Sequence, residues 1–209
     1  KSDMVLGLGT GSTFNFVLEI LSEKVKSGEI KDVIGISTST QTLELARKLN
    51  FPIGKFSDHP KIDLTIDGAD EVDEKLNVIK GGGGALLHEK IIAQASKKVI
   101  IVVDQSKVSK YLGEKWAVPI EVIQKASVSE SEYLKSIGAS VELRKTENNN
   151  FITDEGNYIL DADFGVIKNP KKLAKKLNKR AGIVEHGLFV NMVDHVIVAS
   201  DKDIQILTK

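Results

Sequence analysis

Short apolar runs alternate with amphipathic stretches along the first half of the chain. The runs MVLGLG, VIGIS, LTID and VIIVVD lie between residues 4 and 104. The segments between them carry apolar residues at helical spacing, which predicts helices over residues 12–26, 40–49 and 85–95. Strands that alternate with helices in this way favour a parallel sheet covered by helices on both faces.

The pattern changes after residue 116. A strand around AVPIEVI precedes a helix that SVSE, at Ser127 to Glu130, introduces as a capping box. SVELRK and YILDADF read as two further strands, a helix opens at Pro170, and GIVEH forms a last strand. This βαββαβ order is typical of a ferredoxin-like module. The runs LFVNMVDHVIVAS and DIQILTK then have strand character, and we expect them to return to the first sheet.

The two patterns together predict the domain organisation. We expect a Rossmann-like α/β domain with an open parallel sheet, formed by residues 1–113 and 187–209. A ferredoxin-like α+β domain over residues 114–186 is inserted into it. A role of this insertion in oligomerisation is a further hypothesis.

Composition narrows the classes of function. Lysine plus arginine and aspartate plus glutamate both total 29 in 209 residues, so we expect neither nucleic acid nor a membrane surface as a partner. The chain has no apolar run near the ~20 residues of a membrane span, and its start, KSDMVLGLG, lacks a signal-peptide pattern. The absence of cysteine rules out disulfides and thiolate metal sites, and fits a reducing, cytoplasmic location.

Four segments that could carry chemistry follow predicted strands, where open α/β sheets bind their ligands. The first, GLGTGSTF at residues 7–14, lacks the spacing of a dinucleotide fingerprint, and no lysine precedes Ser12 as a Walker loop requires. Backbone amides at a helix start, with the hydroxyls of Thr10, Ser12 and Thr13, suit a phosphate monoester. The alternative is a tight turn with Ser12 as a simple N-cap.

The second segment, STST at residues 37–40, adds another loop of hydroxyl donors. An N-cap at Ser39 or Thr40 accounts for one hydroxyl and leaves the others, Ser37 and Thr38 among them, for an anion. In the third segment, DGADEVD, Asp67 ends a strand, and we expect Gly68 to let the chain turn so that Asp70 returns to the same edge. Glu71, Asp73 and Glu74 are interpreted as solvated loop charges. We expect no metal here, because no histidine or second acid pair stands at ligand spacing.

The fourth segment, KGGGGALLHEK, places Lys80 and four glycines before a helix. Four glycines are costly to order, so this composition indicates a backbone that a small polar ligand approaches closely. Glu89 in the following helix is either an ordinary acid near a helix start or a group that faces the same ligand. The combination of Asp67, Asp70, Lys80 and Glu89 favours the second interpretation. Lys107, in VVDQSK, offers a further charge for phosphate.

In this order and spacing, GLGTGST, STST, DGADEVD, KGGGGALLHEK and VDQSK resemble the type A ribose-5-phosphate isomerases, over essentially the whole chain. The resemblance implies interconversion of D-ribose 5-phosphate and D-ribulose 5-phosphate in the pentose phosphate pathway, without metal or organic cofactor, by a homodimer or a dimer of dimers. It implies Glu89 as the general base. The implied phosphate and sugar contacts are Thr10, Gly11, Ser12, Thr13, Asp67, Gly68, Ala69, Asp70, Lys80, Gly81, Gly82, Gly83 and Lys107.

The chemistry of an aldose–ketose isomerase fits these residues. One carboxylate, Glu89, can take the C2 proton and return it to C1 through an enediolate. Lys80 and the glycine-loop amides would stabilise that enediolate, at ~3 kcal/mol per donor. Asp67 and Asp70 would hold sugar hydroxyls, with Asp67 favoured to assist ring opening.

Two other classes stay open. An amino-sugar phosphate deaminase would share the phosphate loop, but it would need a catalytic histidine near the acidic segment, and none stands there. A non-catalytic sugar-phosphate sensor would not need Glu89 and Lys80 together and would normally be joined to a basic DNA-binding segment, which this sequence does not contain.

Overall fold

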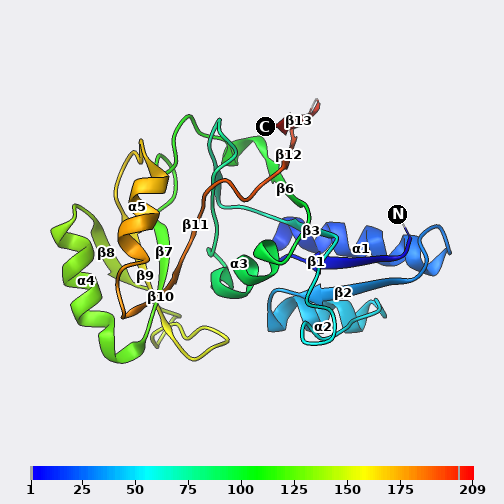
Figure 1. Ribbon diagram of the computed structural model, residues 1–209, viewed down its shortest axis with the longest axis horizontal. Helices are drawn as coiled ribbons and strands as arrows, with labels where there is room; N and C mark the ends of the chain where they lie inside the picture. The colour runs from blue at the N-terminus through cyan, green and yellow to red at the C-terminus, as the bar shows by residue number, and fades with distance from the viewer. Residues whose placement is uncertain (1, 202) are drawn as a thin grey trace. The chain divides into compact units, whose positions relative to one another are not determined.

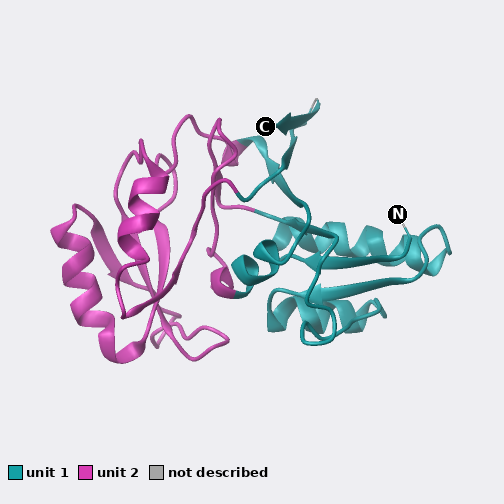
Figure 2. Ribbon diagram, in the orientation of Figure 1, with its two compact units in different colours: residues 1–68, 88–105, 192–209 teal, residues 69–87, 106–191 magenta. Residues whose placement is uncertain are grey.

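The computed structural model describes residues 2–201 and 203–209, and the chain forms two compact units (Figures 1 and 2). Unit 1 comprises Lys1–Gly68, His88–Gln105 and Met192–Lys209, and unit 2 comprises Ala69–Leu87 and Ser106–Asn191. No helix among the described residues has the length and apolar character needed to cross a bilayer.

Unit 1 is built on a six-stranded sheet with the order β13-β12-β6-β3-β1-β2. Its strands are β1 Met4–Leu8, β2 Val33–Ser37, β3 Leu64–Asp67, β6 Val99–Asp104, β12 His195–Ala199 and β13 Ile204–Thr208. Neighbouring strands are parallel except for β12 and β13, which form an antiparallel pair at one edge. The predicted open α/β sheet is therefore confirmed, together with the return of β12 and β13 to it. The start of the run LFVNMVDHVIVAS does not return to this sheet, because Leu188 and Phe189 pair with Ile79 and Val78 of unit 2.

Helices cover both faces of this sheet. Helices α1 (Ser12–Lys26) and α2 (Thr40–Lys48) pack on one face, where Phe14 and Leu18 of α1 are buried against Leu6 and Leu8 of β1. Helix α3 (Leu86–Gln94) packs on the other face through Ile92, which joins Ile36 of β2. The alternation of side chains along each strand explains why both faces carry apolar residues.

Unit 2 contains a four-stranded antiparallel sheet with the order β10-β7-β9-β8. Its strands are β7 Val118–Val122, β8 Ser140–Leu143, β9 Tyr158–Asp163 and β10 Ile183–His186, and its helices are α4 Ser127–Ser136 and α5 Pro170–Leu177. The fourth strand of the βαββαβ unit lies beside the first, and the third lies between the first and the second. This is the order of a ferredoxin-like fold, as the sequence predicts.

A smaller sheet completes unit 2. It has the order β11-β5-β4, from β4 Glu71–Val72, β5 Val78–Ile79 and β11 Leu188–Phe189. Unit 2 thus includes residues 69–87, 106–113 and 187–191 in addition to the predicted insertion. The assignment of residues 114–186 to a domain of their own stays a prediction.

The capping box predicted at Ser127 is wrong. The 3₁₀ turn η2 (Gln124–Ala126) runs directly into α4, so Ala126 holds the N-cap position without a side-chain cap, and Ser127 is already helical. Glu130 does not reach back to the helix start, because its buried carboxylate accepts from Nε of Arg180 at 2.8 Å. A charged partner far along the chain replaces the local bond.

Candidate active site

Unit 1 contains the sheet edge at which the strand order reverses. The chain passes from β1 to β2 on one side, whereas β3 leads to β6 on the other. The segments that follow β1 and β3 therefore diverge, which leaves room for a ligand at the carboxyl ends of these two strands. The segments GLGTGST and DGAD stand at these two strand ends.

Asp67 joins these two segments. Its side chain is buried, and one carboxylate oxygen, Oδ1, accepts from the backbone amide of Thr10 at 3.0 Å and from that of Gly68 at 2.7 Å. The expectation that Gly68 is needed for a sharp turn is wrong. Gly68 does not have a positive φ, and a Cβ there would meet only ordinary contacts, the nearest at 3.8 Å.

The hydroxyls of the second segment hold the first in place. The Thr10 hydroxyl lies 2.8 Å from those of Thr38 and Ser39, and Thr38 donates to the carbonyl of Leu8 at 2.9 Å. Ser39 is the N-cap of α2 and accepts from the amide of Thr42 at 3.1 Å. Thr38 and Ser39 therefore fix the loop after β1, while Ser37 ends β2 half-buried.

The start of α1 lacks a side-chain cap. Gly11 occupies the N-cap position with φ 110°, and Ser12 is the first helical residue, so the interpretation of Ser12 as a simple N-cap is wrong. No acidic residue occupies the first turn. The amides of this turn, beside the exposed Ser12 and the half-buried Thr13, keep the partial positive charge that favours an anion.

Glu89 lies in the first turn of α3. Its side chain is buried, with 4% of its surface exposed. Acidic side chains are rarely this buried, so Glu89 is not an ordinary solvated acid at the start of a helix.

Unit 2 contains the glycine loop. The backbone amide of Gly82 donates to Asp70 Oδ2 at 2.7 Å, and the amide of Gly84 donates to the carbonyl of Gly81 at 2.9 Å. Gly81 has φ 103°, and a Cβ there would lie 2.9 Å from that of Leu86, so only glycine fits this position without strain. A Cβ at Gly82 would lie 2.5 Å from the Asp70 carboxylate, so the backbone approaches that acid closely.

Three cations set the electrostatics of this loop. Burial raises the pKa of Asp70, while its hydrogen bond from Gly82 and the charges of Lys80, Lys107 and Arg144 act in the opposite direction. The buried Lys80 places Nζ 5.8 Å from the ring centre of Phe189, and Nζ of Lys107 lies 5.1 Å from that of Trp116. Two further residues of unit 2 that the resemblance implies as sugar contacts carry no charge: Ala69 is half-buried and Gly83 is exposed.

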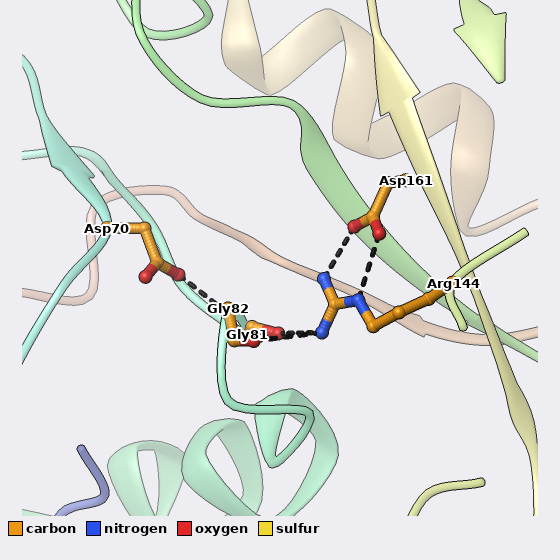
Figure 3. Close-up of polar contacts among 5 residues, drawn as sticks. All are labelled: Asp70, Gly81, Gly82, Arg144 and Asp161. Atoms are coloured by element: carbon orange, nitrogen blue, oxygen red, sulfur yellow. Dashed lines mark hydrogen bonds and ion pairs between the residues drawn. The ribbon is translucent and has the colours of Figure 1, made fainter. Parts of the chain in front are cut away.

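The sequence did not reveal Arg144, which contacts the glycine loop, or its ion-pair partner Asp161. Arg144 donates to the carbonyls of Gly81 and Gly82 and forms a two-pronged ion pair with Asp161 (Figure 3). These contacts join positions more than 60 residues apart, so no local pattern indicates them.

Two acids after Asp70 are not solvated, contrary to the sequence-based interpretation. Glu71 is fully buried and accepts from the backbone amides of Gly113, Glu114 and Lys115. Asp73 is buried and accepts from the amides of Lys75 and Asn77. Backbone donors compensate the burial of both carboxylates, whereas Glu74 is exposed as expected. Among the described residues, no group of three or more acids and histidines could hold a metal ion.

Comparison with known proteins identifies the family. The family model described as ribose 5-phosphate isomerase A (phosphoriboisomerase A) matches residues 34–203. A ribose-5-phosphate isomerase A from Desulfatibacillum aliphaticivorans is 52% identical over 200 residues, covering 95% of this chain and 87% of the relative. One from Chloroflexus aurantiacus is 44% identical over 209 residues, covering 100% of this chain and 87% of the relative.

Solved structures agree with these matches. A D-ribose-5-phosphate isomerase in complex with phospho-erythronic acid superposes with a TM-score of 0.98 at 42% identity, covering 100% of this chain and 92% of that one. The ribose 5-phosphate isomerase of Plasmodium falciparum gives a TM-score of 0.96 at 41% identity, with the same coverage. The fold and these matches define an isomerase enzyme. The chain belongs to the ribose 5-phosphate isomerase A family, which confirms the resemblance drawn from its motifs.

Proposed function

We propose that the chain interconverts D-ribose 5-phosphate and D-ribulose 5-phosphate through an enediolate, with Glu89 as the general base. The observation that carries this proposal is the buried carboxylate of Glu89 in the first turn of α3, the helix that follows the glycine loop. The phospho-erythronic acid bound by the relative supports the ligand class, because it combines a phosphate with a carboxylate.

Each step assigns one proton to one group. Glu89 removes the proton from C2 of the open-chain aldose, and the electron pair of that bond forms the C1–C2 double bond while negative charge develops on O1. The proton of the O2 hydroxyl passes to O1, and Glu89 returns its proton to C1, which gives the ketose. Lys80 and the glycine-loop amides stabilise the charged oxygens.

The remaining groups bind the substrate. Thr10, Gly11, Ser12, Thr13 and Lys107 contact the phosphate, and Asp67 and Asp70 hold sugar hydroxyls. Asp67 assists ring opening. Ser37, Thr38 and Ser39 support the phosphate loop, and the hydroxyl contacts of Thr10 favour this role over direct binding.

The biological setting is also part of the proposal. We place the reaction in the non-oxidative branch of the pentose phosphate pathway in the cytoplasm, without metal or organic cofactor, and we propose a homodimer or dimer of dimers to which residues 114–186 contribute. Sedimentation of the native chain tests the oligomeric state.

Turnover of D-ribose 5-phosphate in heavy water, with a metal chelator present, tests the mechanism. We expect the native chain to form ribulose 5-phosphate that carries solvent deuterium at C1. Glu89→Gln should bind the sugar phosphate but lose isomerisation and exchange, whereas Glu74→Gln, at an exposed acid, should behave as the native chain does. A Glu89→Gln protein with near-native kcat would exclude Glu89 as the base.

A further inference from the structure

Arg144 links the ferredoxin-like sheet to the glycine loop within unit 2. It directly follows β8, and its backbone is held on both sides, since its amide donates to the carbonyl of Ile159 at 2.9 Å and its carbonyl accepts from Phe151 at 2.9 Å. One edge of the guanidinium, Nε and Nη2, pairs with Asp161, and Nη1 donates to the carbonyls of Gly81 at 2.8 Å and Gly82 at 3.1 Å (Figure 3). The arginine side chain is only 14% exposed.

The first of these carbonyl contacts fixes Asp70. In a trans peptide unit the C=O and N–H groups point in opposite directions, and the structure contains no cis peptide bond among the described residues. The unit between Gly81 and Gly82 therefore runs from Arg144, which its carbonyl contacts, to Asp70, which accepts its N–H (Figure 3). Arg144 thus fixes the orientation of the planar peptide group whose N–H donates to the Asp70 carboxylate.

The second contact orients the next amide. Because the Gly82 carbonyl points to Arg144, the N–H of Gly83 in the same peptide unit points away from Arg144. Gly83 is exposed, so a ligand can reach this amide. The positive charge at the carbonyl end also polarises both peptide units, which strengthens their N–H groups as donors.

A second side chain of the hairpin formed by β8 and β9, that of Phe151, packs against the glycine loop. The guanidinium of Arg144 lies 5.7 Å from the ring centre of Phe151. A Cβ on Gly84 would lie 2.3 Å from Phe151 Cζ, so the ring occupies the space beside this glycine. The loop is therefore contacted at Gly81, Gly82 and Gly84 by residues of one hairpin.

We propose that Arg144, anchored by Asp161, is a positioning residue that aims the Gly83 amide and the Asp70 carboxylate at the reacting end of the sugar phosphate. This inference rests on the proposed isomerase mechanism, in which the loop amides stabilise the enediolate. This role requires an arginine, because only a planar guanidinium can pair with a carboxylate along one edge and donate to two carbonyls through its remaining nitrogen.

The experiment compares Arg144→Lys and Asp161→Asn with the native chain. Lysine keeps the charge but lacks the fork, and asparagine keeps the shape of the anchor but lacks its charge. The matched control is Arg180→Lys, which alters another two-pronged arginine–carboxylate pair of unit 2, formed with Glu130. None of the hydrogen bonds described for this pair involves the glycine loop. Steady-state kcat and KM are measured together with inhibition by 4-phosphoerythronate and by inorganic phosphate.

We expect kcat of Arg144→Lys to fall roughly 10- to 100-fold, less than the ~10²- to 10³-fold that loss of an oxyanion donor costs. KM and inhibition by phosphate should change little, whereas 4-phosphoerythronate, whose carboxylate resembles the charged oxygens of the enediolate, should bind more weakly in step with kcat. Asp161→Asn should shift the same quantities in the same direction by less. Arg180→Lys should lower the melting temperature and leave kcat per folded molecule unchanged.

The outcomes separate this inference from the proposed function. An active native chain whose Arg144→Lys and Asp161→Asn variants lose only melting temperature, as Arg180→Lys does, would overturn the positioning role and leave the isomerase assignment intact. A native chain that does not isomerise ribose 5-phosphate would remove the proposed function and, with it, this role in turnover.

Discussion

The backbone amide of Thr10 donates to the carboxylate of Asp67 at 3.0 Å, which ties the loop after β1 to the end of β3. This bond crosses the point where the strand order of the parallel sheet reverses. The two segments proposed to bind the phosphate and the sugar hydroxyls are thus held in register by one buried acid. Any substitution that separates them should affect both binding functions together.

Gly9→Ala should disrupt this tie. A Cβ at residue 9 would lie 2.2 Å from Asp67 Oδ1 and 2.6 Å from Asp67 Cα, and a backbone atom cannot move aside cheaply. We expect the free energy of unfolding to fall by about 1–3 kcal/mol, as for other overpacked sites, and KM for ribose 5-phosphate to rise. Urea unfolding and steady-state kinetics measure the two effects.

Gly68→Ala is the matched control for stability. Its Cβ would meet only the carbonyl oxygens of Thr10 and Val102, at 3.8 and 3.9 Å. This variant should therefore unfold at nearly the native urea concentration. Equal stability of Gly9→Ala and Gly68→Ala would show that the close approach at Gly9 carries no constraint.

Thr42→Val should loosen the same loop from the side of α2. The buried Thr42 hydroxyl donates to the carbonyl of Gly9 at 2.8 Å and lies 3.2 Å from the hydroxyl of Thr10. Valine keeps the volume but removes the donor to the buried Gly9 carbonyl, which costs about 1–3 kcal/mol. Thr42→Ser keeps the hydroxyl and should retain KM, so a rise in KM for valine alone, measured for ribose 5-phosphate, would confirm the role of the hydrogen bonds.

Periodicity predicted the elements that bury an apolar face. Helix α1 occupies the predicted residues 12–26, because Phe14 and Leu18 recur at the spacing that a helix places on one side. Strands β1, β2, β3 and β6 were predicted from apolar runs bounded by polar residues for the same reason. The segments at residues 7–14, 37–40 and 67–73 could be located in the same way, because they stand where β1, β2 and β3 end and the ends of parallel strands meet at one edge of a sheet.

Long-range polar contacts could not be predicted from the sequence. Glu71 looked solvated, since its amide partners at residues 113–115 stand more than 40 positions away. Arg144 carries no local signature for the same reason, because its carbonyl partners in the glycine loop are more than 60 positions away. Ser127 resembles an N-cap in the sequence, but a 3₁₀ turn precedes it in the structure. Local patterns report burial of apolar side chains, whereas compensation of a buried charge depends on the tertiary fold.

Glu71→Gln should therefore destabilise the protein, although the sequence places Glu71 in an acidic loop. An amide side chain presents one acceptor oxygen and an NH₂ group to three backbone donors, so a repulsive donor–donor contact replaces a charge-assisted bond. Because hydrogen bonds to charged groups contribute about 1.5–3 kcal/mol, we expect a loss of that order in the free energy of unfolding. Glu74→Gln, at an exposed position, is the control and should leave the urea midpoint unchanged.

Asp70→Asn should make the protein more stable at neutral pH. Burial raises the pKa of Asp70 above its ordinary value of 3.8, so the folded state binds this proton more tightly than the unfolded state does. Native stability is therefore lost as the pH rises from 3.8 through the folded pKa, and the loss is complete above that pKa. Asparagine avoids the loss and can still accept the amide of Gly82 through its oxygen, while turnover should fall because the carboxylate is gone.

Asp63→Asn is a control with the opposite sign. Its hydrogen bond from Lys97, together with that from the amide of Val5, lowers the pKa of Asp63 below 3.8. Asp63 therefore stabilises the fold above pH 3.8, and this contribution is lost as the pH falls through its folded pKa. The free energy of unfolding is measured with urea at a series of pH values. We expect Asp70→Asn to be more stable than the native chain and Asp63→Asn to be less stable, and both differences should grow as the pH rises toward neutrality. A native chain more stable than Asp70→Asn by a margin that increases with pH would show that Asp70 is stabilised as a carboxylate, and that its hydrogen bond and the cations around it outweigh its burial.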